Sequence, residues 1–265
     1  MSEPTPAVVV ENVQVAYRVA GRQSRKAKRA AATSTDRGRF VIAVDDVSFT
    51  AYEGQTVGVI GRNGSGKSSL LRAVAGLMPV RAGSIQVTDF PVLLGVGAAL
   101  KGDLTGRENI VLGGTALGAS RKSMLDQLDE IIEFAGIDHA IDRPFKTYSS
   151  GMKARLQFAV STAVQPRILL VDEALAVGDE EFKDRSNERV SQLVDGASTV
   201  FLVSHSLSTI KRRCDVALWI DAGRQVMWGD AGEVVTAYRE DMVERRARRA
   251  AQAEKRAAEQ EDRED

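Results

Sequence analysis

The stretch Gly61-Arg62-Asn63-Gly64-Ser65-Gly66-Lys67-Ser68-Ser69 decides the fold of this chain. It matches the pattern of Gly, four residues and Gly-Lys-Ser, which is typical of loops that bind phosphate. The glycines let successive backbone N–H groups point at one anion, and the helix that follows adds partial positive charge. Lys67 can reach the β- and γ-phosphates of a nucleotide, and the Ser68 hydroxyl can join a Mg²⁺ shell. The residues predicted to bind the nucleotide here are Gly61, Asn63, Gly64, Ser65, Gly66, Lys67, Ser68 and Ser69.

The sequence on either side of this loop supports the phosphate-binding interpretation over a chance glycine-rich turn. An apolar strand is predicted over residues 56–60, immediately before the loop. A helix is predicted from Gly66 to about Ala75, because Gly76 follows as a stop signal and Pro79 lies just beyond. Strand followed by loop and helix is the order that such a phosphate site requires.

Two acids follow a second apolar run. Residues 168–171 read Ile-Leu-Leu-Val, which is typical of a buried parallel strand, and Asp172 and Glu173 come directly after it. Adjacent acids at the end of a strand are common by chance. Together with the phosphate loop, however, they predict that Asp172 holds the Mg²⁺ shell and that Glu173 polarises an attacking water as general base.

Strands and helices alternate along the rest of the chain. Strands are predicted at 7–10, 13–17, 47–50, 199–203 and 216–220, and a hairpin turns at Ala222-Gly223. Residues 105–165 are mostly helical, with predicted helices at 105–117, at 120–134 and from Ser150 to just before Pro166. This alternation predicts an α/β sheet that is interrupted by a helical insertion.

Composition limits the function classes. The 265 residues carry 36 Lys and Arg against 36 Asp and Glu, so the net charge of zero argues against a general nucleic-acid binder. The chain has no apolar run of about 18 residues and no signal-peptide pattern at its start, so we expect neither a membrane span nor secretion. A single cysteine, Cys214, excludes an internal disulfide framework and fits a reducing, cytoplasmic compartment.

Two segments are unusually charged. Residues 21–39 carry seven basic residues against one acid, and we interpret them as an exposed basic loop or a short surface helix. This segment is either a solvated loop or a contact for anionic lipid headgroups or a pyrophosphate-linked substrate. Residues 239–265 form a charge-dense tail with few large apolar residues, and we expect a solvated helix or disorder there.

A third motif is ambiguous by itself. Tyr148-Ser149-Ser150-Gly151-Met152-Lys153 stands at the start of a predicted amphipathic helix. On the residues alone it is only a helix N-cap, with Ser149 or Ser150 as the capping residue.

Taken together and in this order, the motifs resemble the ATPase subunit of an ABC transporter, over residues 7 to about 230. The resemblance implies an α/β fold, a P-loop NTPase (RecA-like) core with an antiparallel β subdomain and an inserted α-helical subdomain. The ATPase domain would span 1–238, with the helical subdomain at about 97–165, the basic loop at 21–39 and the charged tail at 239–265.

The resemblance also assigns roles to residues outside the phosphate loop. The family's signature element usually reads Leu-Ser-Gly-Gly-Gln; here Ser149 and Gly151 are retained, whereas Ser150 and Met152 depart from it. Ser149 and Gly151 would contact the γ-phosphate of an ATP molecule that is bound to the partner of a homodimer. The remaining implied residues are His205 as the γ-phosphate switch, Asp179 as the link between the two ATP sites, and Tyr17, otherwise a core tyrosine, as the aromatic that stacks on adenine.

One expected residue is missing, and its absence narrows the resemblance. The glutamine that normally precedes the helical subdomain would fall near Val96, but residues 90–100 contain none. The glycine-rich run from Leu94, followed by Leu-Thr-Gly-Arg-Glu-Asn at 104–109, resembles the polysaccharide-exporting branch of O-antigen, galactan and teichoic acid exporters. Only the charged tail follows Tyr238, so we expect no appended carbohydrate-binding domain.

This branch implies a function that needs a membrane partner. Two copies of the chain would sandwich two ATP molecules with Mg²⁺ and drive a lipid-linked glycan through separate polytopic permease subunits, at the cytoplasmic face of the plasma membrane. An importer or drug-exporter subunit is one alternative, and the missing glutamine argues against it. A soluble ABC ATPase that acts on nucleic acid or ribosomes is another, supported only by the basic segment; we expect no nucleic-acid partner.

Overall fold

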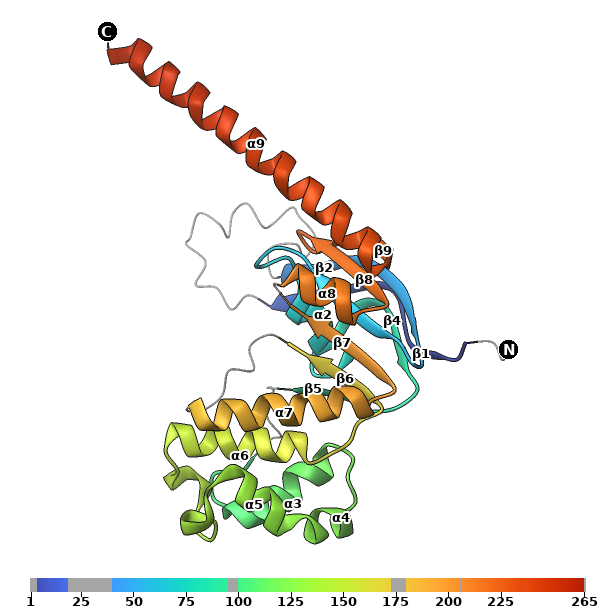
Figure 1. Ribbon diagram of the computed structural model, residues 1–265, viewed down its shortest axis with the longest axis vertical. Coiled ribbons are helices and arrows are strands. Elements are labelled where there is room, and N and C mark those ends of the chain that lie inside the picture. The colour runs from blue at the N-terminus through green and yellow to red at the C-terminus, as the bar shows by residue number, and fades with distance from the viewer. Residues whose placement is uncertain (1–3, 19–39, 95–99, 173–179, 205, 265) are drawn as a thin grey trace, which may run out of the picture.

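The computed structural model of the chain describes residues 4–18, 40–94, 100–172, 180–204 and 206–264, whose strands form two sheets (Figure 1). The smaller, antiparallel sheet has the order β2 (Phe40–Tyr52), β1 (Pro6–Arg18), β4 (Val80–Val87). The larger has the order β5 (Pro91–Leu94), β6 (Ile168–Val171), β7 (Thr199–Val203), β3 (Thr56–Ile60), β8 (Val216–Asp221), β9 (Arg224–Asp230). All neighbours in it pair in parallel except β8 and β9. The predicted fold class, an α/β core with an antiparallel β part and a helical insertion, is confirmed.

Helices cover the parallel strands, which are apolar because both faces are buried. Helix α2 (Lys67–Val74) follows β3, α7 (Glu180–Gly196) lies before β7, and α8 (Leu207–Arg213) lies before β8. Strand β3 can approach α8 closely because it contains Gly58, where a Cβ atom would lie 2.6 Å from Ile210 of α8. Because β6, β7 and β3 pair in parallel, their carboxyl ends lie at the same edge of the sheet.

Strands β1 and β2 are longer than predicted. The sequence suggested two short strands at 7–10 and 13–17, but β1 is continuous and has an irregular register between Val10 and Val13. Likewise, β2 begins at Phe40, well before the predicted 47–50. Asn12 and Asp46 adopt positive φ angles of 46° and 57°, and the Asn12 amide donates to the Asp46 carboxylate at 2.9 Å. These polar residues look like strand breakers, yet here they pair across a bulge within the sheet.

The helical insertion has a core of its own. It contains α3 (Gly106–Ala116), α4 (Arg121–Asp126), α5 (Leu128–Ala135), the 3₁₀ turns η3 (Asp138–Ala140) and η4 (Phe145–Thr147), and α6 (Ser150–Thr162). Figure 1 shows these helices gathered below the larger sheet, with α7 between. The insertion's interior is built from buried apolar residues, among them Ile110, Met124, Ile131, Ile132 and Leu156.

One predicted helix is wrong in its extent. The expected helix at 120–134 is two helices, α4 and α5, which meet at Gln127 with φ −97° and ψ 3°. The Gln127 side-chain amide donates to the hydroxyl and the carbonyl oxygen of Ser123, at 2.9 and 3.3 Å. This local bonding competes with the regular helix at the junction of α4 and α5. The apolar spacing of 120–134 is unaffected, which is why the sequence pattern could not locate the break.

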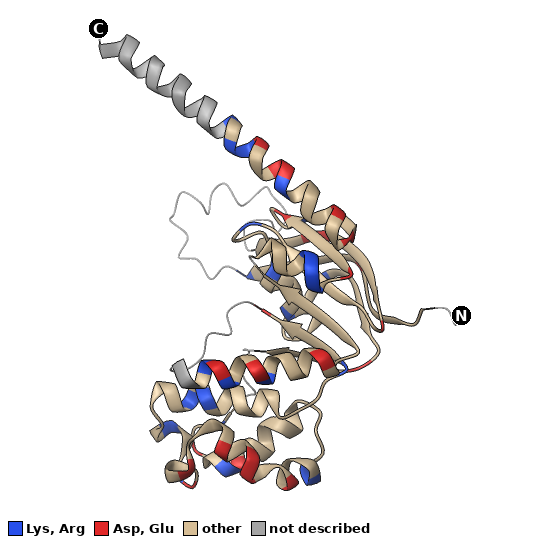
Figure 2. Cartoon of the chain, viewed as in Figure 1, with Lys and Arg blue, Asp and Glu red and all other residues tan. Residues whose placement is uncertain are grey.

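The C-terminal helix α9 (Ala231–Glu264) extends through the whole charged tail and projects away from the sheets (Figure 1). Its first turns are buried, with Val234, Val235 and Tyr238 packed on β8 and α8. Further along, basic and acidic residues are interleaved on its surface (Figure 2). None of the helices in the described ranges is both long and apolar enough to cross a bilayer.

Candidate functional site

The phosphate loop connects β3 to α2 as predicted. Gly61, Gly64 and Gly66 have φ angles of +149°, +76° and +109°, which side-chain-bearing residues rarely adopt. A Cβ atom at Gly61 would collide with the carbonyl oxygen of Ile220, and one at Gly66 with that of Ala43. Glycine is therefore required at both positions by conformation and by space. The loop that results can turn several backbone N–H groups toward one anion.

Lys67 folds back over this loop. Its ammonium group donates to the carbonyl oxygens of Gly61 at 2.8 Å and Arg62 at 2.9 Å, and the side chain is buried. Within the loop, the buried Ser65 hydroxyl has no hydrogen-bond partner among the described residues. The loop therefore combines a fixed cation, a hydroxyl without a hydrogen-bond partner among the described residues and several backbone N–H donors. These groups together suit the binding of a phosphate chain.

A cleft of about 430 Å³ opens beside the loop. Its walls contain the following residues that were predicted to bind nucleotide: Tyr17, Gly64, Ser65, Gly66, Lys67, Ser68 and Ser69. The Tyr17 hydroxyl lies 3.0 Å from that of Ser69, and the ring is 39% exposed, so this tyrosine is not part of the core. An exposed aromatic ring next to an anion-binding loop can accept a planar base while the loop accepts phosphate.

Part of this cleft carries no recognisable motif in the sequence. Val41 and Ile42 of β2 line it although they are 56% and 50% exposed, and Ala222 and Gly223 of the β8–β9 turn also line it. Aliphatic residues in a strand carry no mark of a ligand, so no sequence pattern could have identified Val41 or Ile42. Exposed aliphatic side chains beside Tyr17 extend the apolar wall on which a base can lie.

Asp172 lies at the carboxyl end of β6, as predicted. Strand β7 separates β6 from β3, so the acid and the phosphate loop lie about two strand spacings, or about 10 Å, apart at the same edge of the sheet. Ligands in open α/β sheets bind at this edge. Three further predicted residues, Glu173, Asp179 and His205, lie outside the described residues, as do Val96 and the basic segment 21–39.

Ser149 is the N-cap of α6, where its hydroxyl accepts a hydrogen bond from the Met152 N–H at 3.2 Å. Of the two capping residues that the sequence allowed, the structure therefore has Ser149. Gly151 is exposed, and a Cβ atom added there would meet nothing within 4 Å. The fold of this chain thus does not itself require a glycine at 151. Neither Ser149 nor Gly151 lines the cleft beside the phosphate loop.

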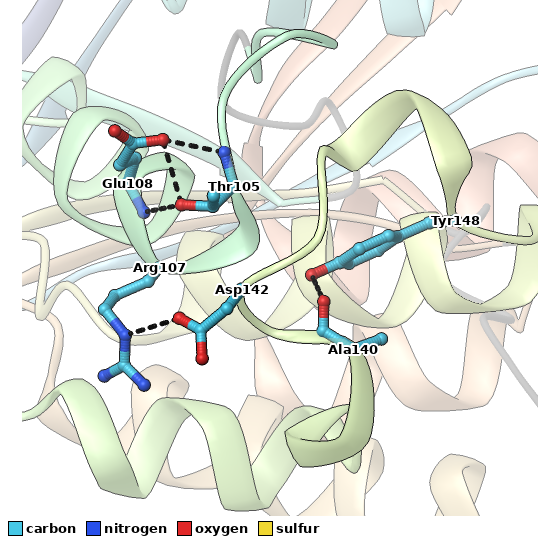
Figure 3. Close-up of polar contacts among 6 residues, drawn as sticks. All are labelled: Thr105, Arg107, Glu108, Ala140, Asp142 and Tyr148. Atoms are coloured by element: carbon cyan, nitrogen blue, oxygen red, sulfur yellow. Dashed lines mark hydrogen bonds and ion pairs between the residues drawn. The ribbon is translucent and has the colours of Figure 1, made fainter.

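Tyr148 anchors the segment that leads into α6 (Figure 3). Its hydroxyl donates to the carbonyl oxygen of Ala140 at 2.8 Å, and burial raises the pKa of the phenol although the nearby Gly106 N–H opposes this shift. Close by, Arg107 pairs with Asp142 at 3.1 Å. The start of α3 and the segment before α6 are therefore held together through residues that lie about 40 positions apart.

The start of α3 is itself tightly bonded. Thr105 and Glu108 form a capping box, in which each side chain accepts from the other's backbone N–H (Figure 3). The fully buried Asn109 amide donates to the carbonyl oxygens of Lys101, Leu104 and Thr105 at 2.9–3.2 Å. In the sequence, Asn109 stands out only as the last residue of the Leu-Thr-Gly-Arg-Glu-Asn motif at 104–109. A buried asparagine inside a helix needs several hydrogen-bond partners. The asparagine at this position of the motif was therefore the feature of the sequence that could have indicated a structural role.

Replacing Gly106 with alanine should lower the free energy of unfolding by about 2 kcal/mol, because overpacking a filled site is destabilising. The new Cβ would collide with the Tyr148 hydroxyl and lie 2.8 Å from Ile141 Cδ1. Urea unfolding measures the change. Gly102→Ala is the matched control, because its Cβ would meet only Lys146 at 3.4 Å. Adding Tyr148→Phe to Gly106→Ala should recover part of the loss, and equal stability of Gly106→Ala and Gly102→Ala would contradict this packing.

Comparison with known proteins agrees with the geometry. The profile of a family described as "ABC transporter" matches residues 44–176, half of the chain. The O-antigen export system ATP-binding protein RfbB of Myxococcus xanthus is 44% identical over 201 residues, covering 76% of this chain and 46% of the relative. The teichoic acids export ATP-binding protein TagH of Bacillus cereus is 38% identical over 232 residues, covering 88% and 42%. This chain thus spans less than half the length of these two relatives.

The same architecture occurs among solved structures. The structure of an ATP-binding subunit of an ABC transporter superposes with a TM-score of 0.63 at 21% sequence identity, covering 88% of this chain and 93% of that one. At this identity the likeness establishes the fold and leaves the substrate open.

Proposed function

Since the chain belongs to the family of ABC transporter ATP-binding proteins, we propose that it binds and hydrolyses ATP to drive polysaccharide export through a separate membrane-spanning partner. The observation that carries the nucleotide part is the cleft, in which an exposed aromatic and aliphatic wall adjoins a glycine-rich phosphate loop and its lysine. The export part is supported by the relatives, whose names concern O-antigen and teichoic acids.

In this proposal ATP lies along the cleft. The backbone N–H groups of residues 61–66 and the N-terminus of α2 hold the phosphates, and Lys67 exchanges its bonds to the Gly61 and Arg62 carbonyls for phosphate oxygens. The Tyr17 ring stacks on adenine, beside Val41 and Ile42. The hydroxyl of Ser65, which is buried without a partner in the described chain, would gain one.

Ser68 and Asp172 would hold a Mg²⁺ ion. A hydroxyl at the start of α2 and a carboxylate at the end of β6 are the oxygen donors that Mg²⁺ takes, usually with waters and substrate phosphates completing its shell. The ion neutralises charge on the β- and γ-phosphates when it is bound. Glu173, directly after Asp172, accepts a proton from the attacking water, and His205, just beyond β7, contacts the γ-phosphate.

The signature segment would act on a second copy of the chain. In a homodimer, Ser149 and Gly151 of one subunit face the ATP of the other, and Asp179 links the two sites. The open space around Gly151 supports this arrangement, because the glycine serves no packing role within its own subunit. Each ATP is then held between two chains, so that binding closes the dimer and hydrolysis reopens it.

Replacing Gly151 with valine should therefore abolish ATP-dependent dimerisation while changing the free energy of unfolding by less than about 1 kcal/mol, the usual range for a glycine in an exposed helix. Size-exclusion chromatography with and without ATP measures dimerisation, and urea unfolding measures stability. Gly229→Val is the control and should dimerise, because a Cβ atom at Gly229 would also meet nothing within 4 Å and this residue lies on β9, outside the signature segment. A Gly151→Val variant that dimerises as the unmodified chain does would contradict this assignment.

A permease supplies the path through the membrane. The described surface that suits it best is an apolar groove of about 550 Å³ between α3 and α4, lined by Leu104, Val111, Leu112 and Leu125 among others. Leu125 is 47% exposed, so the groove is open to a partner. A helix of the permease that lies in this groove would place the chain at the cytoplasmic face of the plasma membrane and transmit closure of the dimer.

Co-purification in detergent tests the export proposal. The chain is tagged in cells that make a surface polysaccharide, the membranes are dissolved, and the captured proteins are identified. We expect a polytopic membrane protein in stoichiometric amount. It should be lost when Leu125 is replaced by aspartate and kept when Leu77, which is exposed and lies outside the groove, is replaced by aspartate. Capture of soluble proteins alone, or hydrolysis of ATP that is stimulated by nucleic acid, would overturn the proposal.

A further inference from the structure

The C-terminal helix α9 is joined to the body of the protein by an ion-pair network. Arg245, about four turns into the helix, pairs through Nη1 with Asp221 at 2.8 Å and through Nε with Asp241 at 2.6 Å. Asp221 is the last residue of β8, and its side chain is only 20% exposed. A guanidinium that binds two carboxylates through different nitrogens fixes their relative positions.

The residue after Asp221 begins a turn that touches the nucleotide cleft. Ala222 and Gly223 have φ angles of 49° and 85°, and both line the cleft. The Gly223 N–H donates to the carbonyl oxygen of Ser65 in the phosphate loop at 2.9 Å, and the Gly223 carbonyl accepts from Asp45 of β2 at 2.7 Å. The turn therefore fixes both the phosphate loop and the strand that carries Val41 and Ile42.

The base of α9 lies behind the same loop. The Tyr238 ring packs edge-on against Trp219 of β8, with their centroids 5.3 Å apart, in a cluster that also contains Ile60, the residue before the loop. Burial raises the pKa of the Tyr238 hydroxyl, and the positive charge of Arg62 in the loop opposes this shift. Helix α9 thus reaches the phosphate loop by two routes, through β3 and through the β8–β9 turn.

We propose that Asp221 and Arg245 are positioning residues for nucleotide binding, through which the projecting helix α9 sets the affinity of the phosphate loop for ATP. The pair holds the β8–β9 turn, the turn holds Ser65, and Ser65 belongs to the loop that binds phosphate. When Arg245 releases Asp221, the turn and the loop sample more conformations and the binding-competent one is less populated. Since the projecting part of α9 continues beyond Arg245, whatever displaces that part would change ATP affinity at the site.

Replacing Arg245 with alanine should raise the dissociation constant for ATP about fivefold, at the lower end of measured couplings between sites. The maximal rate at saturating ATP should be unchanged, because the loop is correctly formed once nucleotide is bound. Isothermal titration and steady-state kinetics on the purified full-length chain give the two values. Arg248→Ala is the matched control, because Arg248 also forms an i,i+4 pair, with Glu244 at 3.0 Å on α9 itself.

Asp221→Asn tests the pair from the other side. It should weaken ATP binding by a similar factor. The double variant with Arg245→Ala should bind no more weakly than either single variant, because both changes remove the same ion pair between Arg245 and Asp221. Arg245→Lys keeps the positive charge, so it should bind ATP more tightly than Arg245→Ala.

The inference rests on the proposed nucleotide site, and the two fail in different ways. Lys67→Ala with unchanged ATP affinity would overturn the site itself. Loss of binding in Lys67→Ala together with unchanged binding in Arg245→Ala and Asp221→Asn would overturn the positioning role alone. Equal losses in Arg245→Ala and Arg248→Ala, or a fall in the maximal rate without a change in affinity, would overturn it as well. A fivefold loss confined to the two variants of the pair is the result expected.

Discussion

Replacing Lys67 with alanine is expected to weaken ATP binding about 100-fold and to abolish hydrolysis. Hydrogen bonds to charged groups contribute about 1.5–3 kcal/mol each, and a phosphate chain bound by the ammonium group would lose at least one of them. Lys67 is held between the carbonyl oxygens of Gly61 and Arg62, and it is the one Lys or Arg among the described side chains that line the cleft. Binding is measured by titration with labelled nucleotide.

A control is needed because Lys67 also bonds to the loop itself. Arg72 lies on the same helix, is exposed and does not line the cleft, so Arg72→Ala removes a cation from α2 without touching the site. It should bind ATP as the unmodified chain does. If Lys67→Ala and Arg72→Ala bind ATP equally well, the phosphate loop is not the nucleotide site.

Replacing Glu173 with glutamine is expected to leave ATP binding intact and to reduce turnover strongly, whereas Lys67→Ala loses both. A general base contributes about 10²- to 10⁴-fold to rate, so hydrolysis should fall by about 1,000-fold. ATP affinity should remain, because Lys67, Ser68 and Asp172 are unchanged. With binding intact and hydrolysis stopped, the closed dimer should accumulate in the presence of ATP.

Size-exclusion chromatography and single-turnover hydrolysis measure the two effects of Glu173→Gln. Glu188→Gln, an exposed change on α7, is the matched control and should leave both unchanged. Near-normal hydrolysis by Glu173→Gln would remove this residue from the role of base. A variant that fails to dimerise with ATP would contradict the arrangement in which two chains enclose each nucleotide.

The sequence predicts the strand, loop and helix around residues 61–69 well, because each part of this conformation is a local requirement. Gly61 and Gly66 are needed for their backbone angles and for the space that Ile220 and Ala43 leave. The strand before the loop and the helix after it follow from apolar runs and stop signals that occupy a few consecutive residues. Such features can be recognised in a single sequence without knowledge of what packs against them.

Contacts between distant segments could not be predicted in this way. The break at Gln127 depends on a side chain that bonds within its own helix, and the pattern of apolar residues runs through it unchanged. The contact of Tyr148 with the start of α3 joins segments about 40 residues apart, and only the packing reveals why position 106 is a glycine. The sequence predicts that charged residues of the tail, such as Arg245, are solvated. In the structure, however, the Arg245 side chain is held by an ion pair with Asp221.

The most direct test of the account is the location of polysaccharide in cells whose gene for this chain carries Lys67→Ala. We expect polysaccharide to disappear from the cell surface and lipid-linked polysaccharide to accumulate inside, whereas cells with Arg72→Ala keep a normal surface. A normal amount of surface polysaccharide in the Lys67→Ala cells, with no lipid-linked material inside, would contradict the claim that ATP bound by this chain drives export.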